Sequence, residues 1–220
     1  MIRRYVVIAI VILLLIAAFA YAHFRSGNTR LTEIPPFAPP AITHAAALPH
    51  APAHTIVIID ENKSFEEIIG NTKDAPYLNQ IAPKGALFTQ SYGVAHPSQP
   101  NYFALFSGLT NANGDSCAVA GVPPDAPNLA TALLGAKRSF AGYAEGLPSV
   151  GFAGCTAGNY ARKHAPWTHF SNVPAALSRP YSTFKYASIP TLSFIIPNIM
   201  DDMHTGTLAS GDAWMRRNLT

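Results

Sequence analysis

Two apolar runs, "HTIVIID" at 54–60 and "PTLSFIIP" at 190–197, constrain the fold of this chain most. Such runs, rich in β-branched residues, are typical of strands buried on both faces, as in a parallel sheet. Strand-like and helix-like segments alternate between them: strands are predicted at 86–93 and 138–145, and helices from Ser64 onward and at 75–85, 100–108 and 127–136. This alternation predicts an α/β fold with a mainly parallel central sheet flanked by helices.

Several helix ends carry local signals. Ser64 and Glu67 stand three residues apart ahead of an apolar pair, which is the capping-box pattern. Pro100 suits the first turn of the helix at 100–108, and Gly108 suits its C-terminal cap. Near the C-terminus, "GDAWMRRNLT" resembles the opening of another helix.

The N-terminus predicts export. Two arginines precede an uncharged apolar run from Tyr5 to Ala22 that ends in small residues. Both a cleaved signal peptide and an uncleaved membrane anchor fit residues 1–24, and the choice between them stays open. A Pro- and Ala-rich stretch at 25–53 has no apolar periodicity and predicts an extended linker, so the folded domain is expected at 54–220.

Charge and cysteine content indicate which partners and which cellular compartment suit this chain. The net charge is +3, and the lysines and arginines are scattered without a basic stripe, which argues against nucleic acid as a partner. Cys117 and Cys155 are the only cysteines. In an oxidising compartment such a pair predicts one disulfide, with two buried free thiols as the alternative.

Three polar clusters fall just after or between predicted strands. The first is Asp60-Glu61-Asn62, where adjacent carboxylates at a strand end favour a nearby cation but also suit a solvated turn. The second follows the strand predicted at 86–93 and contains His96, Ser98 and Asn101. The third contains Asp201, Asp202 and His204, a ligand set for zinc, manganese or iron, or else a polar loop. In α/β sheets, clusters at the carboxyl ends of strands gather at one site.

Ser98 lies between Pro97 and Pro100 at a predicted helix N-terminus, where an anion or an alkoxide is stabilised. An ordinary N-cap serine explains the same position. Asn101 is expected either to donate to a phosphoryl oxygen or to bond a loop carbonyl. Trp167, His169 and Phe170 are interpreted as local packing residues, with a pocket lining as the alternative, and His164 is interpreted as structural.

The segment "ENKSFEEIIGN…APYLNQIAPKGALFTQSYGVAHPSQPNYFALFSG" resembles the bacterial and fungal phosphoesterase family that includes acid phosphatases and non-haemolytic phospholipases C. That family belongs to the alkaline-phosphatase-like superfamily. "SFIIPNIMDDMH" is similar to a later segment of the same family, and the resemblance extends from about Thr55 to Trp214.

The resemblance implies a phosphoester hydrolase that uses a serine nucleophile and a divalent metal, with zinc, manganese, iron and calcium all open. Ser98 is implied as the nucleophile and His96 as a support at the edge of the site. Glu61 and Asn62 are implied in metal and phosphate binding. Asp202 and His204 are implied in the same metal or phosphate site.

Members of this family usually continue to a further strand that ends in an acidic pair, so the domain is expected to be incomplete at its C-terminus. Two alternatives to the phosphatase stay open. One is a phosphodiesterase of the phospholipase C type acting on a lipid phosphoester. The other is an inactive scaffold or binding protein that kept the fold. A small-molecule or lipid phosphoester is the expected substrate, and the membrane is a partner if the N-terminal segment stays attached.

Overall fold

In the computed structural model, residues 52–117 and 119–219 are described, and those from Pro52 onward belong to one unit. The predicted signal or anchor and nearly all of the predicted linker lie outside the described residues. Within the described part, no helix is both long enough and apolar enough to cross a membrane.

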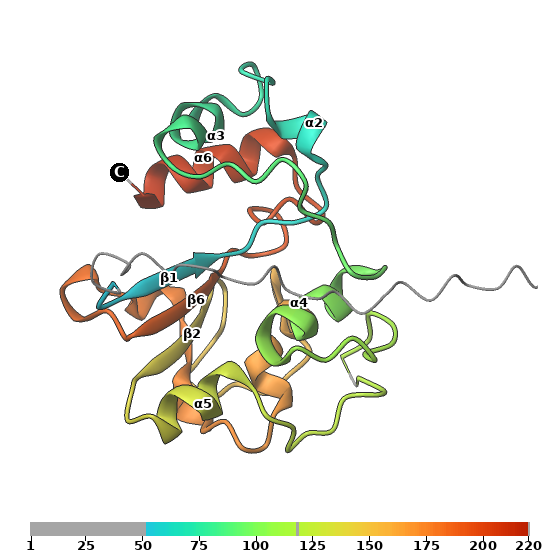
Figure 1. Ribbon diagram of the computed structural model, residues 1–220, viewed down its shortest axis with the longest axis vertical. Helices are drawn as coiled ribbons and strands as arrows, with labels where there is room; N and C mark the ends of the chain where they lie inside the picture. Colours follow the sequence, from blue (N-terminus) through green and yellow to red (C-terminus); the bar gives the residue numbers. More distant parts are fainter. Residues whose placement is uncertain (1–51, 118, 220) are drawn as a thin grey trace, which may run out of the picture. The chain divides into compact units, whose positions relative to one another are not determined.

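The centre of the fold is a four-stranded parallel sheet with the strand order β1-β6-β2-β5 (Figure 1). Its strands are β1 (Thr55–Ile58), β2 (Phe140–Ala144), β5 (Ser178–Pro180) and β6 (Leu192–Ile196). The strands β3 (Thr156–Ala157) and β4 (Tyr160–Ala161) form a separate antiparallel pair. The predicted α/β fold with a mainly parallel sheet is confirmed.

The α-helices are α2 (Phe65–Ile68), α3 (Pro76–Ile81), α4 (Ser98–Ser107), α5 (Leu129–Gly135) and α6 (Leu208–Leu219). Short 3-10 helices are η1 (Ala82–Lys84), η2 (Arg162–His164), η3 (Pro166–His169), η4 (Ala175–Leu177), η5 (Tyr181–Thr183) and η6 (Tyr186–Ser188).

Alternation along β6 divides the core between the two faces of the sheet. Phe194 joins an aromatic cluster that includes Phe106 of α4, whereas the next residue, Ile195, joins a smaller cluster with Trp214 of α6. Successive side chains of a strand point to opposite faces, so α4 and α6 cover opposite sides of the sheet. Figure 1 shows this layered arrangement.

Trp167 is buried against the middle of β2. A Cβ on Gly142 would lie only 2.2 Å from the Trp167 ring, so the glycine leaves the space that the indole occupies. The indole Nε1 donates to Ser178 Oγ over 3.0 Å. Phe170 is buried in the same core, and His169 Nε2 bonds the Val122 carbonyl, so these three residues pack locally. Trp167 and Phe170 also line a cavity, so both interpretations hold for them.

Several predicted ends and the disulfide are confirmed. Ser64 forms the capping box of α2 with Glu67, and Gly108 ends α4 in the left-handed conformation. Cys117 and Cys155 form a disulfide.

Two predictions about strands were wrong. The segment 86–93 forms no strand, because no described strand lies beside it to accept its hydrogen bonds. β1 is only partly buried rather than buried on both faces, because it lies at an edge of the described sheet and pairs only with β6.

Candidate active site

The site begins where β1 and β6 end, because parallel neighbours finish at the same edge of a sheet. Ile59 N donates to the Ile195 carbonyl over 3.2 Å, which continues the ladder beyond the strands. Glu61 N then donates to the Asp202 carbonyl over 2.8 Å. These bonds hold the loop that carries Glu61 against the loop that carries Asp202 and His204.

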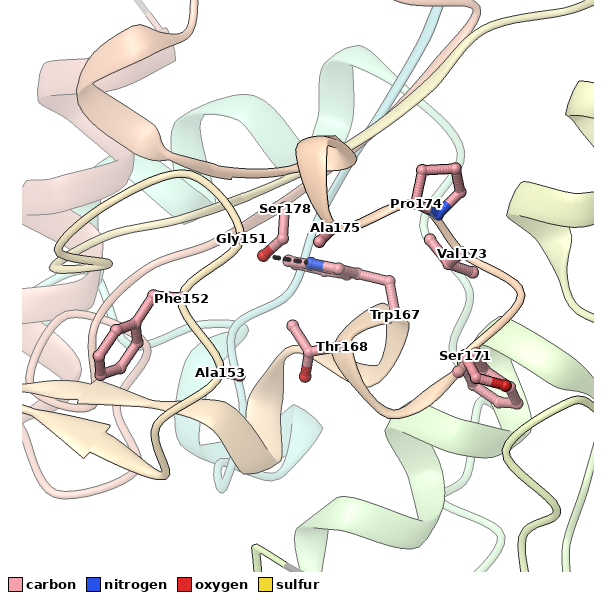
Figure 2. Close-up of a pocket in the computed structure, with 11 residues that line it drawn as sticks. Gly151, Phe152, Ala153, Trp167, Thr168, Ser171, Val173, Pro174, Ala175 and Ser178 are labelled. Atoms are coloured by element: carbon pink, nitrogen blue, oxygen red, sulfur yellow. Dashed lines mark hydrogen bonds between the residues drawn. The ribbon is translucent and has the colours of Figure 1, made fainter.

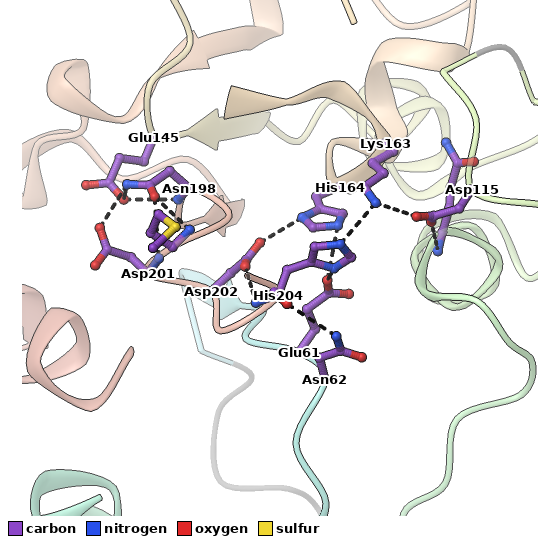
Figure 3. Close-up of polar contacts among 12 residues, drawn as sticks. Glu61, Asn62, Asp115, Glu145, Lys163, His164, Asn198, Asp201, Asp202 and His204 are labelled. Atoms are coloured by element: carbon purple, nitrogen blue, oxygen red, sulfur yellow. Dashed lines mark hydrogen bonds and ion pairs between the residues drawn. The ribbon is translucent and has the colours of Figure 1, made fainter. Parts of the chain in front are cut away.

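Three side chains offer donor atoms to one point in space (Figure 3). One ligand atom each from Glu61, His164 and His204 lies within 4.8 Å of the others. His164 Nε2 is 3.1 Å from Glu61 Oε1, and His204 Nδ1 contacts the same carboxylate oxygen. His164 comes from η2, far along the chain from both partners, and it replaces Asp202 in the donor set that the sequence predicted.

Asp202 lies behind His164 instead. Its Oδ2 is 2.7 Å from His164 Nδ1, and its Oδ1 accepts from His204 N over 2.8 Å. Asp202 is fully buried and His164 is 1% exposed. Tyr102 stacks on the imidazole with ring centroids 5.0 Å apart. These contacts fix the ring and direct its second nitrogen, Nε2, toward Glu61.

The charges in this cluster are strongly coupled. Burial alone would raise the Glu61 pKa, but the neighbouring side chains of His164, Ser98 and His204 lower it to about 2. Burial alone would lower the His164 pKa, but the hydrogen bond to Asp202 and the negative charges of Asp202 and Glu61 raise it to about 9. The cluster therefore stabilises a carboxylate beside positive charge, whether that charge is a proton or a metal ion.

Ser98 approaches the cluster from α4. It is the first residue of the helix, Pro97 holds the N-cap position, and α4 has no side-chain cap. The Ser98 side chain instead lies near Glu61 and helps to lower the pKa of that carboxyl. The interpretation of Ser98 as an ordinary N-cap was therefore wrong, because the preceding residue occupies that position.

Lys163 extends the site on the side of His204. Its Nζ is 3.2 Å from His204 Nε2 and forms an ion pair with Asp115. Asp115 Oδ1 also accepts from Gln99 N over 3.1 Å, which connects this pair to the first turn of α4. The disulfide forms just beside this pair, since Cys155 O accepts from Arg162 N over 2.9 Å.

Comparison with known proteins identifies the family of the chain. The profile of the Phosphoesterase family matches residues 71–220. The chain belongs to the phosphoesterase family. A phosphatidylinositol-3-phosphatase from Mycobacterium tuberculosis is 49% identical over 80% of this chain and 59% of its own length. A phosphate-repressible acid phosphatase from Penicillium chrysogenum is 28% identical over 89% of this chain and 52% of its own length.

An acid phosphatase from Aspergillus fumigatus is 29% identical over 80% of this chain and 44% of its own length. The chain thus spans about half the length of the curated relatives that it matches. No solved structure matches the chain.

The other residues predicted for this phosphoesterase site lie at its edge or outside it. Asn62 Nδ2 donates to the His204 carbonyl over 3.4 Å, so its amide joins the two loops. Asn101 Oδ1 accepts from Val94 N and its Nδ2 donates to the Ser98 carbonyl, which is the loop-bonding alternative. His96 is exposed and makes no hydrogen bond or ion pair with any described residue.

The sequence analysis missed His164 and Lys163. His164 was interpreted as a structural residue, and its part in the donor set comes from the fold. The two residues lie in "YARKHAPW", which has no spacing typical of a ligand motif. Only the tertiary contact with Glu61 and His204 distinguishes them from an ordinary polar turn.

A second polar cluster lies at the ends of β2 and β6 (Figure 3). Asn198 Nδ2 donates to Glu145 Oε2 and to Asp201 Oδ2, both over 2.8 Å. Asn198 N also donates to Glu145 Oε2 over 3.0 Å. This cluster satisfies its own carboxylates and holds the loop after β6 in place.

A separate cavity of about 320 Å³ lies beside Trp167 (Figure 2). Its lining contains none of the residues of the donor cluster and is mostly apolar, including Phe152, Phe170 and Val173.

Proposed function

We propose that this chain carries the nucleophile and metal ligands of an exported phosphoester hydrolase of the acid-phosphatase type. The observation that carries the proposal is the gathering of Glu61, His164 and His204 at one point, with the Ser98 side chain close enough to Glu61 to lower the pKa of that carboxyl. A serine that begins a helix without capping it, and that lies beside a metal-type donor cluster, is suited to attack phosphorus.

The donor cluster fits a divalent metal ion. His164 Nε2 is buried and makes no well-formed hydrogen bond, while its Nδ1 is bonded to Asp202. A carboxylate behind a metal-binding imidazole is a common arrangement, because it fixes the ring and increases its basicity. Two imidazole nitrogens and one carboxylate oxygen also form a recurrent zinc ligand set with an open position. Glu61, His164 and His204 would hold the ion.

The protein residues have distinct tasks in hydrolysis. Ser98 Oγ bonds to phosphorus as the bond to the ester oxygen breaks and the alcohol leaves. Water then attacks the phosphoserine, which releases phosphate and regenerates Ser98. A divalent ion, when bound, neutralises phosphoryl charge and favours the serine alkoxide. Lys163 supplies positive charge beside His204, and the N-terminal amides of α4 add to it.

A phosphomonoester is the preferred substrate class, because the relatives named above are phosphatases. The one with the highest identity among them is named for a phosphorylated inositol lipid, which supports a lipid headgroup as one substrate. The disulfide and the apolar run at residues 5–22 support export.

The test is hydrolysis of p-nitrophenyl phosphate by the full-length protein. Ser98→Ala is expected to abolish turnover, because the nucleophile is lost. Ser107→Ala is the matched control on the same helix, since Ser107 Oγ bonds only the backbone of neighbouring residues, donating to the Phe103 carbonyl and accepting from Leu109 N. Undiminished turnover in Ser98→Ala would refute the nucleophile assignment.

A further inference from the structure

The segment that leads into α4 exposes large apolar side chains. We call residues 85–94 the apolar loop. Phe88 is 77% exposed, Tyr92 is 82% exposed and Val94 is 59% exposed, and Leu87 is also exposed. Soluble surfaces rarely gather such side chains within one short segment unless they bind something.

The backbone of this loop also makes few hydrogen bonds within the described part of the chain. Among the described residues, residues 86–93 make no backbone hydrogen bond, and they belong to no strand or helix. Only its end is fixed, where Asn101 Oδ1 accepts from Val94 N over 2.7 Å. Asn101 Nδ2 also donates to the Ser98 carbonyl over 3.2 Å. One side chain therefore joins the end of the apolar loop to the proposed nucleophile.

Gly93 makes this junction tight. A Cβ at that position would lie 3.1 Å from Asn101 Oδ1. The close approach keeps the loop end against the start of α4, so a surface that binds the loop would lie near Ser98.

The stretch of sequence that contains the apolar loop carries no negatively charged side chain. Between Asp74 and Asp115 the sequence has no carboxylate, and Lys84 directly precedes the apolar loop. Asp115 itself is paired with Lys163. An anionic surface that contacts the loop would thus meet no carboxylate of the loop itself.

We propose that the apolar loop docks on an anionic lipid bilayer and presents the site around Ser98 to phosphorylated headgroups. This proposal rests on the proposed function and specifies the physical state of its substrate. Phe88 and Leu87 would enter the boundary between headgroups and acyl chains, and Tyr92 suits that boundary because its ring is apolar and its hydroxyl polar. The free backbone groups of the loop stay hydrated at that depth, which the hydrocarbon core would not allow.

A β-strand from another polypeptide is the competing occupant. It would use the free backbone groups, but it would leave the lack of carboxylates unexplained. Apolar side chains also lie at adjacent positions, Leu87 and Phe88, whereas neighbours in a strand point to opposite faces. The observations therefore favour lipid.

Fluorescence quenching tests the docking directly. Trp167 and Trp214 are each 1% exposed, so Phe88→Trp introduces an exposed indole. Val150→Trp is the matched control, because Val150 is a half-exposed apolar residue on another loop. Both full-length proteins carry the same N-terminal residues, so any binding by that segment affects them equally.

Brominated phosphatidylcholine vesicles that contain phosphatidylserine are expected to quench Phe88→Trp and to leave Val150→Trp largely unquenched. Equal quenching of both variants, or no quenching of either, overturns the proposal. A change in Phe88→Trp emission with protein concentration, without vesicles and without quenching by them, identifies a polypeptide partner and also overturns it.

Activity provides the second measurement. Phe88→Ser combined with Tyr92→Ser is expected to weaken vesicle binding and turnover of phosphoinositide in vesicles by about tenfold or more. Its hydrolysis of p-nitrophenyl phosphate should match that of the Val150→Ser control. Equal loss on both substrates, or no loss on vesicles, contradicts docking. If the unchanged protein hydrolyses neither substrate yet Phe88→Trp is quenched, the proposed function fails and the docking stands.

Discussion

Two polar clusters lie side by side at the carboxyl ends of the strands, and they differ in how their hydrogen bonds are satisfied. In the Glu145–Asn198–Asp201 cluster, one amide serves both carboxylates. In the donor cluster, buried His164 Nε2 makes no well-formed hydrogen bond and has only the Glu61 carboxylate 3.1 Å away. A buried group left unsatisfied costs free energy, so its retention indicates a ligand or a reaction. Position at a strand end alone does not distinguish the two clusters.

The largest effect is expected from removing the His164 imidazole, whose Nε2 makes no well-formed hydrogen bond. His164→Gln is expected to abolish stoichiometric divalent metal and to lower p-nitrophenyl phosphate turnover by more than about a hundredfold. Metal analysis of the purified full-length proteins, with circular dichroism as a check on folding, measures this. Asn198→Ala is the matched control from the other cluster and should keep its metal. An unchanged protein that holds no metal and releases no phosphate would favour the inactive scaffold instead.

A smaller effect is expected from the residue behind the imidazole. Asp202→Asn keeps the shape of the side chain but weakens its hold on His164 Nδ1, so metal affinity should fall by about 10–100-fold. Asp201→Asn is the neighbouring control, since Asp201 bonds Asn198 rather than the donor cluster. Titration with a competing chelator gives both affinities. Equal affinities would show that Asp202 does not support the metal ligand.

The smallest catalytic effect is expected from a substitution in the Glu145–Asn198–Asp201 cluster. Asn198→Ala leaves Glu145 and Asp201 without their shared donor, which should lower the free energy of unfolding by about 1–3 kcal/mol. Turnover of p-nitrophenyl phosphate per folded molecule should be unchanged. Denaturant unfolding and the activity assay measure the two quantities. A large loss of turnover without loss of stability would place this cluster in the reaction.

Local signals in the sequence were largely sufficient to predict the strands, helices and helix caps of the fold. The runs at 54–60 and 190–197 predicted β1 and β6, and the Ser64 capping box and the Gly108 cap depend only on near neighbours. Parallel strands end at one edge, so the sequence also indicated that Glu61 and His204 would meet. These features follow from backbone geometry and burial over a few residues.

Tertiary structure decided the rest. His164 joined the donor set and Asp202 moved behind it because the chain after β4 returns to the end of β1, which no local pattern records. Ser98 is not the N-cap residue, because Pro97 holds that position and Ser98 is already the first residue of α4. The segment 86–93 has the composition of a strand, but a strand requires a hydrogen-bonding neighbour, and the described fold offers none. The sequence thus determined which reactive side chains are present and where the local elements form. Which residues each of those side chains contacts, and therefore what it can do, depended on which distant segments the fold brings together.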